Sequence, residues 1–269
     1  MRIGKQDNAF TAIATSDEHS ITVRGNDLCR DLIGKTDFTS YFWLLVIGDR
    51  PTDVQRRITD ACLVAIAEHG LVPSVQAARM TLAAGPDAWQ GAISAGLLGM
   101  GSVVAGSSET AGQYLVDLVE EVRSSGSDAD SVARKSLEAL KARRAKVPGL
   151  GHPQHSAGDP RAIVLLEIAE KEGIVGPHIE MLNTLAQHAP QIINRPLPIN
   201  VSGAIPALML DAGWPAKAMK GIPLLARTGG LVAHLFEESQ RSIGFIMSNH
   251  ADEAIAYDGV SSAPTARQG

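Results

Sequence analysis

The sequence predicts an all-α fold of about ten helices packed in layers, and three observations favour this class. Aromatic residues make up only 4% of the 269 residues, so the chain is short of the side chains that fill pleated sheets. Within residues 53–69, apolar residues recur three to four positions apart, as on one face of a helix. Pro51 precedes this segment and Gly70 follows it, where proline and glycine commonly mark the two ends of a helix.

The expected elements follow one another along the chain with short breaks. Residues 11–34 mix polar and β-branched side chains around Gly25, and they are expected to form one or two short strands or a turn that leads into a helix. Helical stretches are then expected at residues 38–47, 53–69, 73–83 and 88–106, at two places within 110–146, and at 162–173, 178–189, 204–213 and 221–240. The tail from Ser261 onward is expected to be frayed or disordered.

Glycines are frequent in residues 88–106, where the absence of side chains allows a neighbouring backbone or a ligand to approach closely. They are Gly91, Gly96, Gly99, Gly101 and Gly106. A dinucleotide-binding fingerprint is excluded here, because the spacing is not G-x-G-x-x-G and no strand is expected before it.

Charge and composition exclude several classes of function. The net charge is -5, with 24 Lys and Arg against 29 Asp and Glu, which gives no concentrated positive field for a nucleic acid. The first residues carry early charges and no apolar stretch long enough for a signal peptide, so none is expected. No segment elsewhere approaches ~18 uninterrupted apolar residues, so no membrane span is expected. Cys29 and Cys62 lie in segments of different character, which argues against a disulfide framework or a thiolate metal site. These features predict a cytoplasmic protein.

Two polar features stand near the middle of the chain. The loop of residues 147–162 is rich in Gly and Pro and carries His152 and His155, and loops of this kind often carry function. No metal is expected there, because no carboxylate pattern accompanies the two histidines. A basic cluster precedes the loop and either complements a helix dipole or binds phosphate. Its members are Lys141, Arg143, Arg144 and Lys146.

Five stretches carry a resemblance to a known family: EHGLVPSVQAARMTLAAG, AISAGLLGMG, GLGHPQHSAGDPRA, INVSGAI and LLARTGGLVAHL. Their order and spacing resemble the citrate synthase superfamily. The likeness is greater to its citryl-CoA lyase module, including the C-terminal end of ATP-citrate lyase, than to full citrate synthases. The resemblance implies an all-α homodimer with a large helical domain formed by residues 1–106 and 213–269. A smaller domain of residues 107–212 would be inserted into it, with the substrate bound between the two.

The resemblance also assigns roles to particular residues. His69, between Glu68 and Gly70, is similar to the histidine that hydrogen-bonds the oxaloacetate part of the substrate. His152 is similar to the histidine that acts on the carbonyl or hydroxyl oxygen, and Arg161 to the arginine that clamps a substrate carboxylate.

Coenzyme A is the further substrate that the resemblance implies, bound along residues 147–161. Backbone amides of this loop and the end of the basic cluster are expected to meet its phosphates. The residues expected to bind it are Gly149, Leu150, Gly151, Arg144 and Lys146.

Three positions depart from the family pattern. Residues 200–202 read Asn-Val-Ser where the family has Asn-Val-Asp, so Ser202 replaces the catalytic carboxylate. Residues 103–106 read Val-Val-Ala-Gly and lack the histidine that citrate synthases carry before a Gly-Gly pair. A late arginine of the family falls at or near Asn249, with Arg241 close to it in the sequence.

Cleavage of a 3-hydroxyacyl thioester requires three groups, and the sequence offers candidates for each. A base must take the proton of the hydroxyl, and histidine titrates near neutral pH, which favours His152. Arginine holds a carboxylate by paired hydrogen bonds, which favours Arg161 and, beside it, Arg227 or Arg241. The α-carbon needs a proton carrier, and Ser202 is a poor base unless another residue activates it. The candidate site residues are therefore His69, His152 and Ser202 for catalysis, and Arg161, Arg227, Arg241 and Asn200 for substrate binding.

Structural interpretations remain open for several of these side chains. His69 stands near a helix end and can interact with the helix dipole. Arg227 lies on an apolar helix and needs a carboxylate partner from either the protein or a ligand. His234 in the same helix is expected to be a packed histidine with one hydrogen-bond partner.

The sequence therefore predicts an enzyme that interconverts citryl-CoA, or a related 3-hydroxyacyl-CoA, with acetyl-CoA and oxaloacetate or another oxo acid. Two alternatives stay open: an enzyme of the same fold whose acceptor lacks one carboxylate, and a non-catalytic protein that binds CoA esters. The expected partners are these small molecules, with no nucleic acid and no membrane. A separate ligase would make the CoA thioester where ATP drives the reaction.

Overall fold

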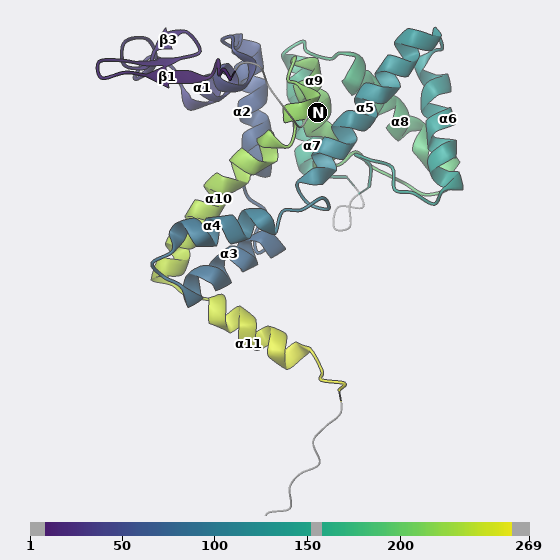
Figure 1. The fold of residues 1–269 in the computed structure, drawn as a ribbon. Helices are drawn as coiled ribbons and strands as arrows, with labels where there is room; N and C mark the ends of the chain where they lie inside the picture. Colours follow the sequence, from purple (N-terminus) through teal and green to yellow (C-terminus); the bar gives the residue numbers. More distant parts are fainter. Residues whose placement is uncertain (1–8, 152–157, 260–269) are drawn as a thin grey trace, which may run out of the picture. The chain divides into compact units, whose positions relative to one another are not determined.

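Helices dominate the structure, which is a computed structural model that describes residues 9–151 and 158–259 (Figure 1). The described part of the chain holds eleven α-helices and one small antiparallel sheet, which confirms the all-α prediction. No helix in these residues is long and apolar enough to cross a membrane. The tail from Ser261, which the sequence predicts to be disordered, lies outside the described residues.

The N-terminal segment forms the short strands that its β-branched residues predict. Strands β1 (Ala14–Ser16), β2 (Ile21–Val23) and β3 (Asn26–Asp27) pair antiparallel in that order. A short π-helical segment, Leu28–Leu32, follows at once, and the Asp27 side chain accepts hydrogen bonds from its first backbone amides.

The helices begin where capping residues or prolines place them. Thr52 forms a capping box with Gln55 at the start of α2, and Pro73, Pro160 and Pro177 occupy the first positions of α3, α7 and α8. The bounds are α1 Phe38–Ile47, α2 Asp53–Ala67, α3 Pro73–Ala84, α4 Trp89–Leu98, α5 Gly106–Ser125, α6 Ala129–Ala142, α7 Pro160–Lys171, α8 Pro177–Ile193, α9 Val201–Asp211, α10 Gly221–Gln240 and α11 Gly244–Ala254.

One expected helical stretch differs from the structure, and one helix of the structure is not expected. The stretch predicted at residues 88–106 ends as α4 at Leu98, because Gly99 follows as its C-cap and α5 starts only at Gly106. Helix α11 is not predicted by the sequence pattern at all.

Contacts divide the chain into two units. Unit 1 runs up to Glu68 and from Ser102 to Arg227, and unit 2 runs from His69 to Gly101 and from Thr228 onward. Helix α10 contributes its first residues to unit 1 and the others to unit 2. The predicted inserted domain, residues 107–212, lies within unit 1, and the predicted division into domains stays a prediction.

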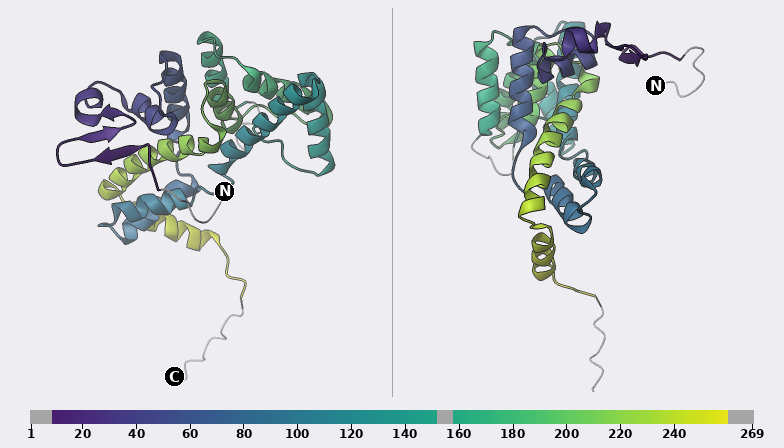
Figure 2. Two further views of the ribbon diagram at one scale, coloured as in Figure 1. Left: turned by 45° about the horizontal axis from the view of Figure 1, so that its top comes forward. Right: turned by 90° about the vertical axis from the view of Figure 1, so that its left-hand side faces the viewer.

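The core of unit 1 is built around α9, which is buried along most of its length. Helices α2, α5, α7 and α8 all contact it (Figure 1, Figure 2). At its C-terminal end, Trp214 is buried against two aromatic rings of α1, with ring centroids 5.3 Å from Phe42 and 5.2 Å from Trp43. The start of α9 is therefore held by packing on several sides.

Unit 2 is centred on a buried ion pair between Arg79 of α3 and Glu238 of α10, with Arg79 Nε 2.7 Å from Glu238 Oε2. Glu238 also accepts hydrogen bonds from the backbone amides of Ile243 and Gly244, where α11 begins. The start of α11 is thus capped from the preceding helix and not by a neighbouring residue. This explains why the local sequence gives no start signal for it.

Glycine allows the close helix packing that the sequence predicts for unit 2. A Cβ atom on Gly96 of α4 would lie 2.8 Å from Leu231 Cδ1 of α10. His234 of α10 is half-buried, and its Nδ1 lies 3.4 Å from Arg79 Nη1.

In unit 1, α9 is tied to α8 by the buried carboxylate of Asp211. It accepts hydrogen bonds from the backbone amides of Gly176, His178 and Ile179 at 2.9 to 3.1 Å. Oδ1 of Asp211 also lies 2.7 Å from Nδ1 of His178. A carboxylate at the start of a helix satisfies free amides and complements the helix dipole, so Asp211 caps α8 from the end of α9.

Replacing Asp211 by Ala is expected to lower the free energy of unfolding by about 2–3 kcal/mol, because the buried amides lose a charged acceptor. Denaturant unfolding measures the change. Asp117→Ala is the matched control, because Asp117 is an exposed carboxylate on α5. Equal stability of the two variants would contradict the capping role.

Candidate active site

The start of α9 and the loop of residues 149–151 are joined by hydrogen bonds from Asn200. The Asn200 amide donates to Gly149 O at 3.0 Å, and Asn200 Nδ2 donates to Gly151 O at 2.6 Å. Its Oδ1 accepts from the Gly203 amide at 3.1 Å, which makes Asn200 the N-cap of α9. Asn200 therefore acts as a connector in this structure, and its predicted contact with substrate is untested.

Two glycines allow the loop to lie directly on α9. A Cβ atom on Gly203 would stand 2.5 Å from Gly149 O, which is closer than side-chain carbons approach backbone. Gly149 itself has φ +81°, a conformation that favours glycine. Any larger residue at position 203 would push the loop away from the helix.

Asp159 is fully buried and is hydrogen-bonded both to Arg161 and to the start of α9. Its carboxylate accepts two side-chain hydrogen bonds from Arg161, at 3.0 and 2.9 Å, and one from the Val201 amide at 2.9 Å. Burial alone raises the pKa of the Asp159 carboxyl, but the bonds from Arg161 and Val201 outweigh it and the pKa lies below its ordinary value. Asp159 thus fixes Arg161 beside the first residue of α9.

Arg227, the last residue of unit 1, is a buried cation. Its exposed fraction is 3%, and its Nε and Nη1 atoms have no hydrogen-bond partner among the residues that the structure describes. Burial lowers the pKa of its guanidinium, the charge of Glu68 opposes this, and the like charge of Arg161 adds to it. Arg227 and Arg161 are therefore near enough to repel each other. Arg161 is hydrogen-bonded to Asp159, whereas Nε and Nη1 of Arg227 are left without a hydrogen-bond partner among the described residues.

Ser202 occupies the first turn of α9 and is half-buried. Its Oγ lies 3.0 Å from Oγ of Ser107, which is in the first turn of α5. The Ser107 hydroxyl also lies 2.7 Å from the Val104 carbonyl oxygen. The first turns of two helices thus meet through a pair of hydroxyl groups.

The structure brings together only part of the predicted site. Asn200, Ser202, Arg161 and Arg227 lie in unit 1, together with the loop of residues 149–151. His152 lies outside the described residues. In unit 2, His69 follows α2 and is half-buried, and Arg241 is exposed and donates a hydrogen bond to Glu237. Arg144 and Lys146 follow α6 and are exposed.

The expected CoA-binding amides are partly engaged within the protein. Leu150 N donates to Val147 O at 3.3 Å, and Gly151 N donates to Pro198 O at 2.7 Å. Leu150 and Ile199 also form an isolated antiparallel bridge. Contact of these residues with CoA stays a prediction.

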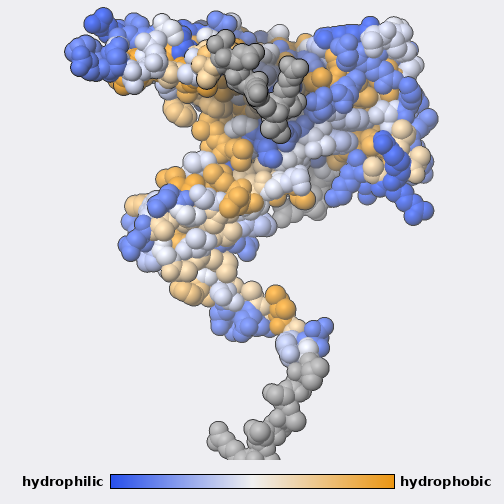
Figure 3. Space-filling view, in the orientation of Figure 1, coloured by the Kyte–Doolittle hydropathy of each residue, from blue (hydrophilic) through white to orange (hydrophobic). Residues whose placement is uncertain are grey.

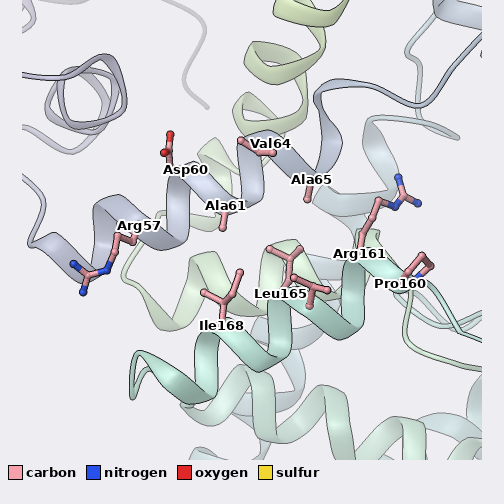
Figure 4. Close-up of a pocket in the computed structure, with 10 residues that line it drawn as sticks. Arg57, Asp60, Ala61, Val64, Ala65, Pro160, Arg161, Leu165 and Ile168 are labelled. Atoms are coloured by element: carbon pink, nitrogen blue, oxygen red, sulfur yellow. The ribbon is translucent and has the colours of Figure 1, made fainter.

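An apolar groove of about 580 Å³ runs between α2 and α7 (Figure 4). Ala61 and Ala65 of α2 face Leu165 and Ile168 of α7 across it, and Arg161 lies at one end. The groove walls carry mainly methyl and methylene groups, so the groove offers space for an apolar group and few polar atoms for chemistry.

No group of three His, Cys, Asp or Glu side chains that could hold a metal occurs among the residues placed by the structure. The described residues of the site provide arginines, backbone amides, two hydroxyl groups and the carboxylate of Asp159. Sequence reasoning missed the positioning role of Asp159 and the contact of Ser107. Asp159 had a local signal, because an acidic residue before Pro160 is typical of a helix N-cap.

Comparison with known proteins agrees with this architecture. Residues 8–246 match the family described as citrate synthase, C-terminal domain. The chain belongs to the citrate synthase family. Its fold is also that of a citryl-CoA lyase from Hydrogenobacter thermophilus, with a TM-score of 0.83, 28% identity and coverage of 97% of this chain and 96% of that one.

Two other proteins that the chain resembles are longer than it is. A citrate synthase homologue from Mycobacterium tuberculosis is 30% identical over 186 residues, which cover 67% of this chain and 47% of the homologue. The chain thus spans about half the length of such relatives. The ATP citrate lyase of Methanothrix soehngenii shares the fold with a TM-score of 0.74 and 21% identity, over 97% of this chain and 43% of that one.

Replacing Asp159 by Asn is expected to lower the free energy of unfolding at pH 7 by about 3 kcal/mol, because it removes one partner of a buried ion pair. The contribution of Asp159 depends on a carboxyl whose pKa is lowered by folding. This contribution to stability is complete above pH ~4, the pKa of the carboxyl in the unfolded chain. It is lost as the pH falls through the lower pKa of the carboxyl in the folded protein. Denaturant unfolding of both proteins from about pH 7 to pH 3 should show a stability difference that narrows below about pH 4. A difference that stays constant would refute the ionised pair.

Proposed function

We propose that the protein is a carbon–carbon lyase or synthase that interconverts citryl-CoA, or a related 3-hydroxyacyl-CoA, with acetyl-CoA and an oxo acid such as oxaloacetate. The fold of the Hydrogenobacter thermophilus citryl-CoA lyase covers nearly the whole chain and supports this class of reaction. The Methanothrix soehngenii enzyme was solved with citrate and coenzyme A, which supports the same class of ligands. A separate ligase would supply the CoA thioester where ATP drives the reaction.

The buried guanidinium of Arg227 is the observation that carries the proposal, because its Nε and Nη1 atoms have no hydrogen-bond partner among the described residues. Buried donors without an acceptor are costly, and the cost is recovered when an anion binds. A carboxylate of citryl-CoA or of oxaloacetate fits this requirement, because a carboxylate oxygen accepts charge-assisted hydrogen bonds from guanidinium N–H groups such as those of Nε and Nη1. Arg161, held by Asp159, would face a second carboxylate of the same substrate.

The other predicted residues supply the remaining roles. His152 would take the proton of the substrate hydroxyl during cleavage, and His69 would hydrogen-bond the oxo acid. Arg144 and Lys146 are exposed cations after α6 and would pair with the phosphates of CoA. The protein is expected to work in the cytoplasm.

A second candidate function is favoured by Ser202. A neutral hydroxyl is a weak base, so an acyl-CoA enzyme whose acceptor lacks one carboxylate, or a protein that binds CoA esters without cleaving them, would suit the same residues. Release of free CoA from citryl-CoA separates the candidates. Tight binding of citryl-CoA without CoA release would leave the binding protein as the better description.

A homodimer is the proposed assembly, with unit 2 at its interface. Large apolar side chains are exposed there, and Figure 3 shows orange surface over α4 and α11. Val232 and Phe236 lie four residues apart on α10, so they share one helix face, and Phe236 is 57% exposed. Phe245 and Ile246 of α11 are also exposed. Exposed apolar groups of this size favour burial against a second copy.

Replacing Arg227 by Met is expected to stabilise the ligand-free protein by about 1 kcal/mol or more, because a buried charge with two unsatisfied nitrogens is removed. The same variant should lose the rise in melting temperature that oxaloacetate gives the wild type, and should release CoA from citryl-CoA at least ~100-fold more slowly. Thermal unfolding with and without oxaloacetate, and a thiol assay for CoA, measure these effects.

Arg161→Met is the matched control, because Arg161 is paired with Asp159. It should also weaken the substrate effect, but it should destabilise the ligand-free protein by leaving a buried carboxylate without its cation. If both variants were destabilised alike, Arg227 would have a structural partner and the proposed anion site would be wrong.

Replacing Phe236 by Asp is expected to convert a dimer to a monomer, because a charge would be buried in an apolar interface. Sedimentation equilibrium measures the mass of the wild-type and variant proteins in solution. Phe38→Asp is the control, because Phe38 is an exposed phenylalanine of unit 1. A wild-type mass of one chain would refute the dimer.

A further inference from the structure

Ser107 and Ser202 form a hydroxyl pair at the place where the first turns of α5 and α9 meet. Both side chains are half-buried, so a substrate can reach them and their bonds are partly shielded from water. The Ser107 hydroxyl has one proton and two oxygen atoms within reach, Val104 O at 2.7 Å and Ser202 Oγ at 3.0 Å. Its proton can therefore take either of two positions by rotation about one bond.

The carboxylate bonded to the start of α9 is not available to carry a proton. Asp159 is fully buried, and its two oxygens accept hydrogen bonds from Arg161 and from the Val201 amide. These bonds hold the pKa of its carboxyl below the ordinary value, which makes the ionised form a weak base. Glu109, in the first turn of α5, is exposed and lies 3.7 Å from Lys220 Nζ. Among the described residues, the hydroxyl pair is thus a proton-carrying group that the structure places at this turn.

We propose that Ser202 gives a proton to the α-carbon during thioester cleavage and that Ser107 positions Ser202 and restores its proton. This assignment rests on the proposed function and names a role for Ser107 in it. An alcohol is a stronger acid than the α-carbon of a thioester, so transfer of a proton from a hydroxyl to an enolate is favourable. A carboxylic acid is not required for that direction of transfer.

Atoms and charges balance when a 3-hydroxyacyl thioester is cleaved in this way. A base takes the proton of the substrate hydroxyl, the bond between the α- and β-carbons breaks, and its electron pair forms the thioester enolate. Ser202 gives its proton to the α-carbon, and the electron pair of its O–H bond stays on Oγ. Ser107 gives its proton to that oxygen, and a water molecule restores the proton of Ser107. The hydroxide that remains combines with the proton that the base releases.

The position of Ser107 suits this exchange. While its proton points to Val104 O, its oxygen can accept a hydrogen bond from Ser202 and hold that side chain in one rotamer. When Ser202 becomes an alkoxide, the stronger acceptor draws the proton of Ser107 toward it. Ser107 therefore acts through Ser202 and is a positioning residue that need not touch the substrate.

The test measures kcat and KM for CoA release from citryl-CoA by the full chain and four variants. Ser202→Ala is expected to lower kcat by ~100-fold, as for loss of a general acid, and Ser107→Ala by about 10-fold with KM changed less than about twofold. Ser107→Thr keeps a hydroxyl and should return kcat to within about threefold of the wild type. The double variant should be no slower than Ser202→Ala alone, because the two groups act as one unit.

Ser124→Ala is the matched control, because Ser124 lies on the same helix and its hydroxyl donates to the Glu120 carbonyl at 2.7 Å. If Ser107→Ala kept the kcat of this control, or if the losses of the two single variants multiplied in the double variant, the relay would be overturned and the lyase would stand. Full activity of Ser202→Ala would also overturn it and would point to another proton donor. If the wild type released no CoA, the proposed function would fail, and the relay with it.

Discussion

The buried carboxylate of Asp159 is the interaction on which the arrangement of the site depends. It is fully buried and would be strongly destabilising if it were unpaired, so its hydrogen bonds to Arg161 and Val201 must form together on folding. Those bonds join the start of α7 to the start of α9. Asn200 then joins α9 to the loop of residues 149–151, which makes these segments one connected structure.

Arg227 lies near this structure but is left out of its pairing. A protein that optimised stability alone would pair this cation or replace it by an apolar residue, whereas functional sites commonly keep groups that lower stability. The Nε and Nη1 atoms of Arg227, which have no hydrogen-bond partner among the described residues, represent a stability cost that a bound anion removes. Arg161, by contrast, is hydrogen-bonded to Asp159 and maintains the fold.

The helices could be predicted from the sequence because their signals are local, as with the Pro and Gly residues around α2 and α3. The functional contacts could not, because they join residues far apart in the chain: Asp159 to Val201, and Ser107 to Ser202. Helix α11 was missed for the same reason, since Glu238 caps it from the preceding helix. For Arg227 the sequence predicts only part of the outcome. Its place on an apolar helix indicates that the side chain is buried, but it does not indicate which group binds the guanidinium.

A hydroxyl at position 202 fits the electrostatics of the first turn of α9. The amide of Val201 is already bonded to the carboxylate of Asp159, so a second carboxylate at this turn would meet a like charge and would also compete with the substrate for nearby cations. Ser202 is neutral and adds no charge at this turn. The same neutrality limits the residue to giving a proton rather than taking one, which is why its hydroxyl partner, Ser107, matters to the chemistry of this site.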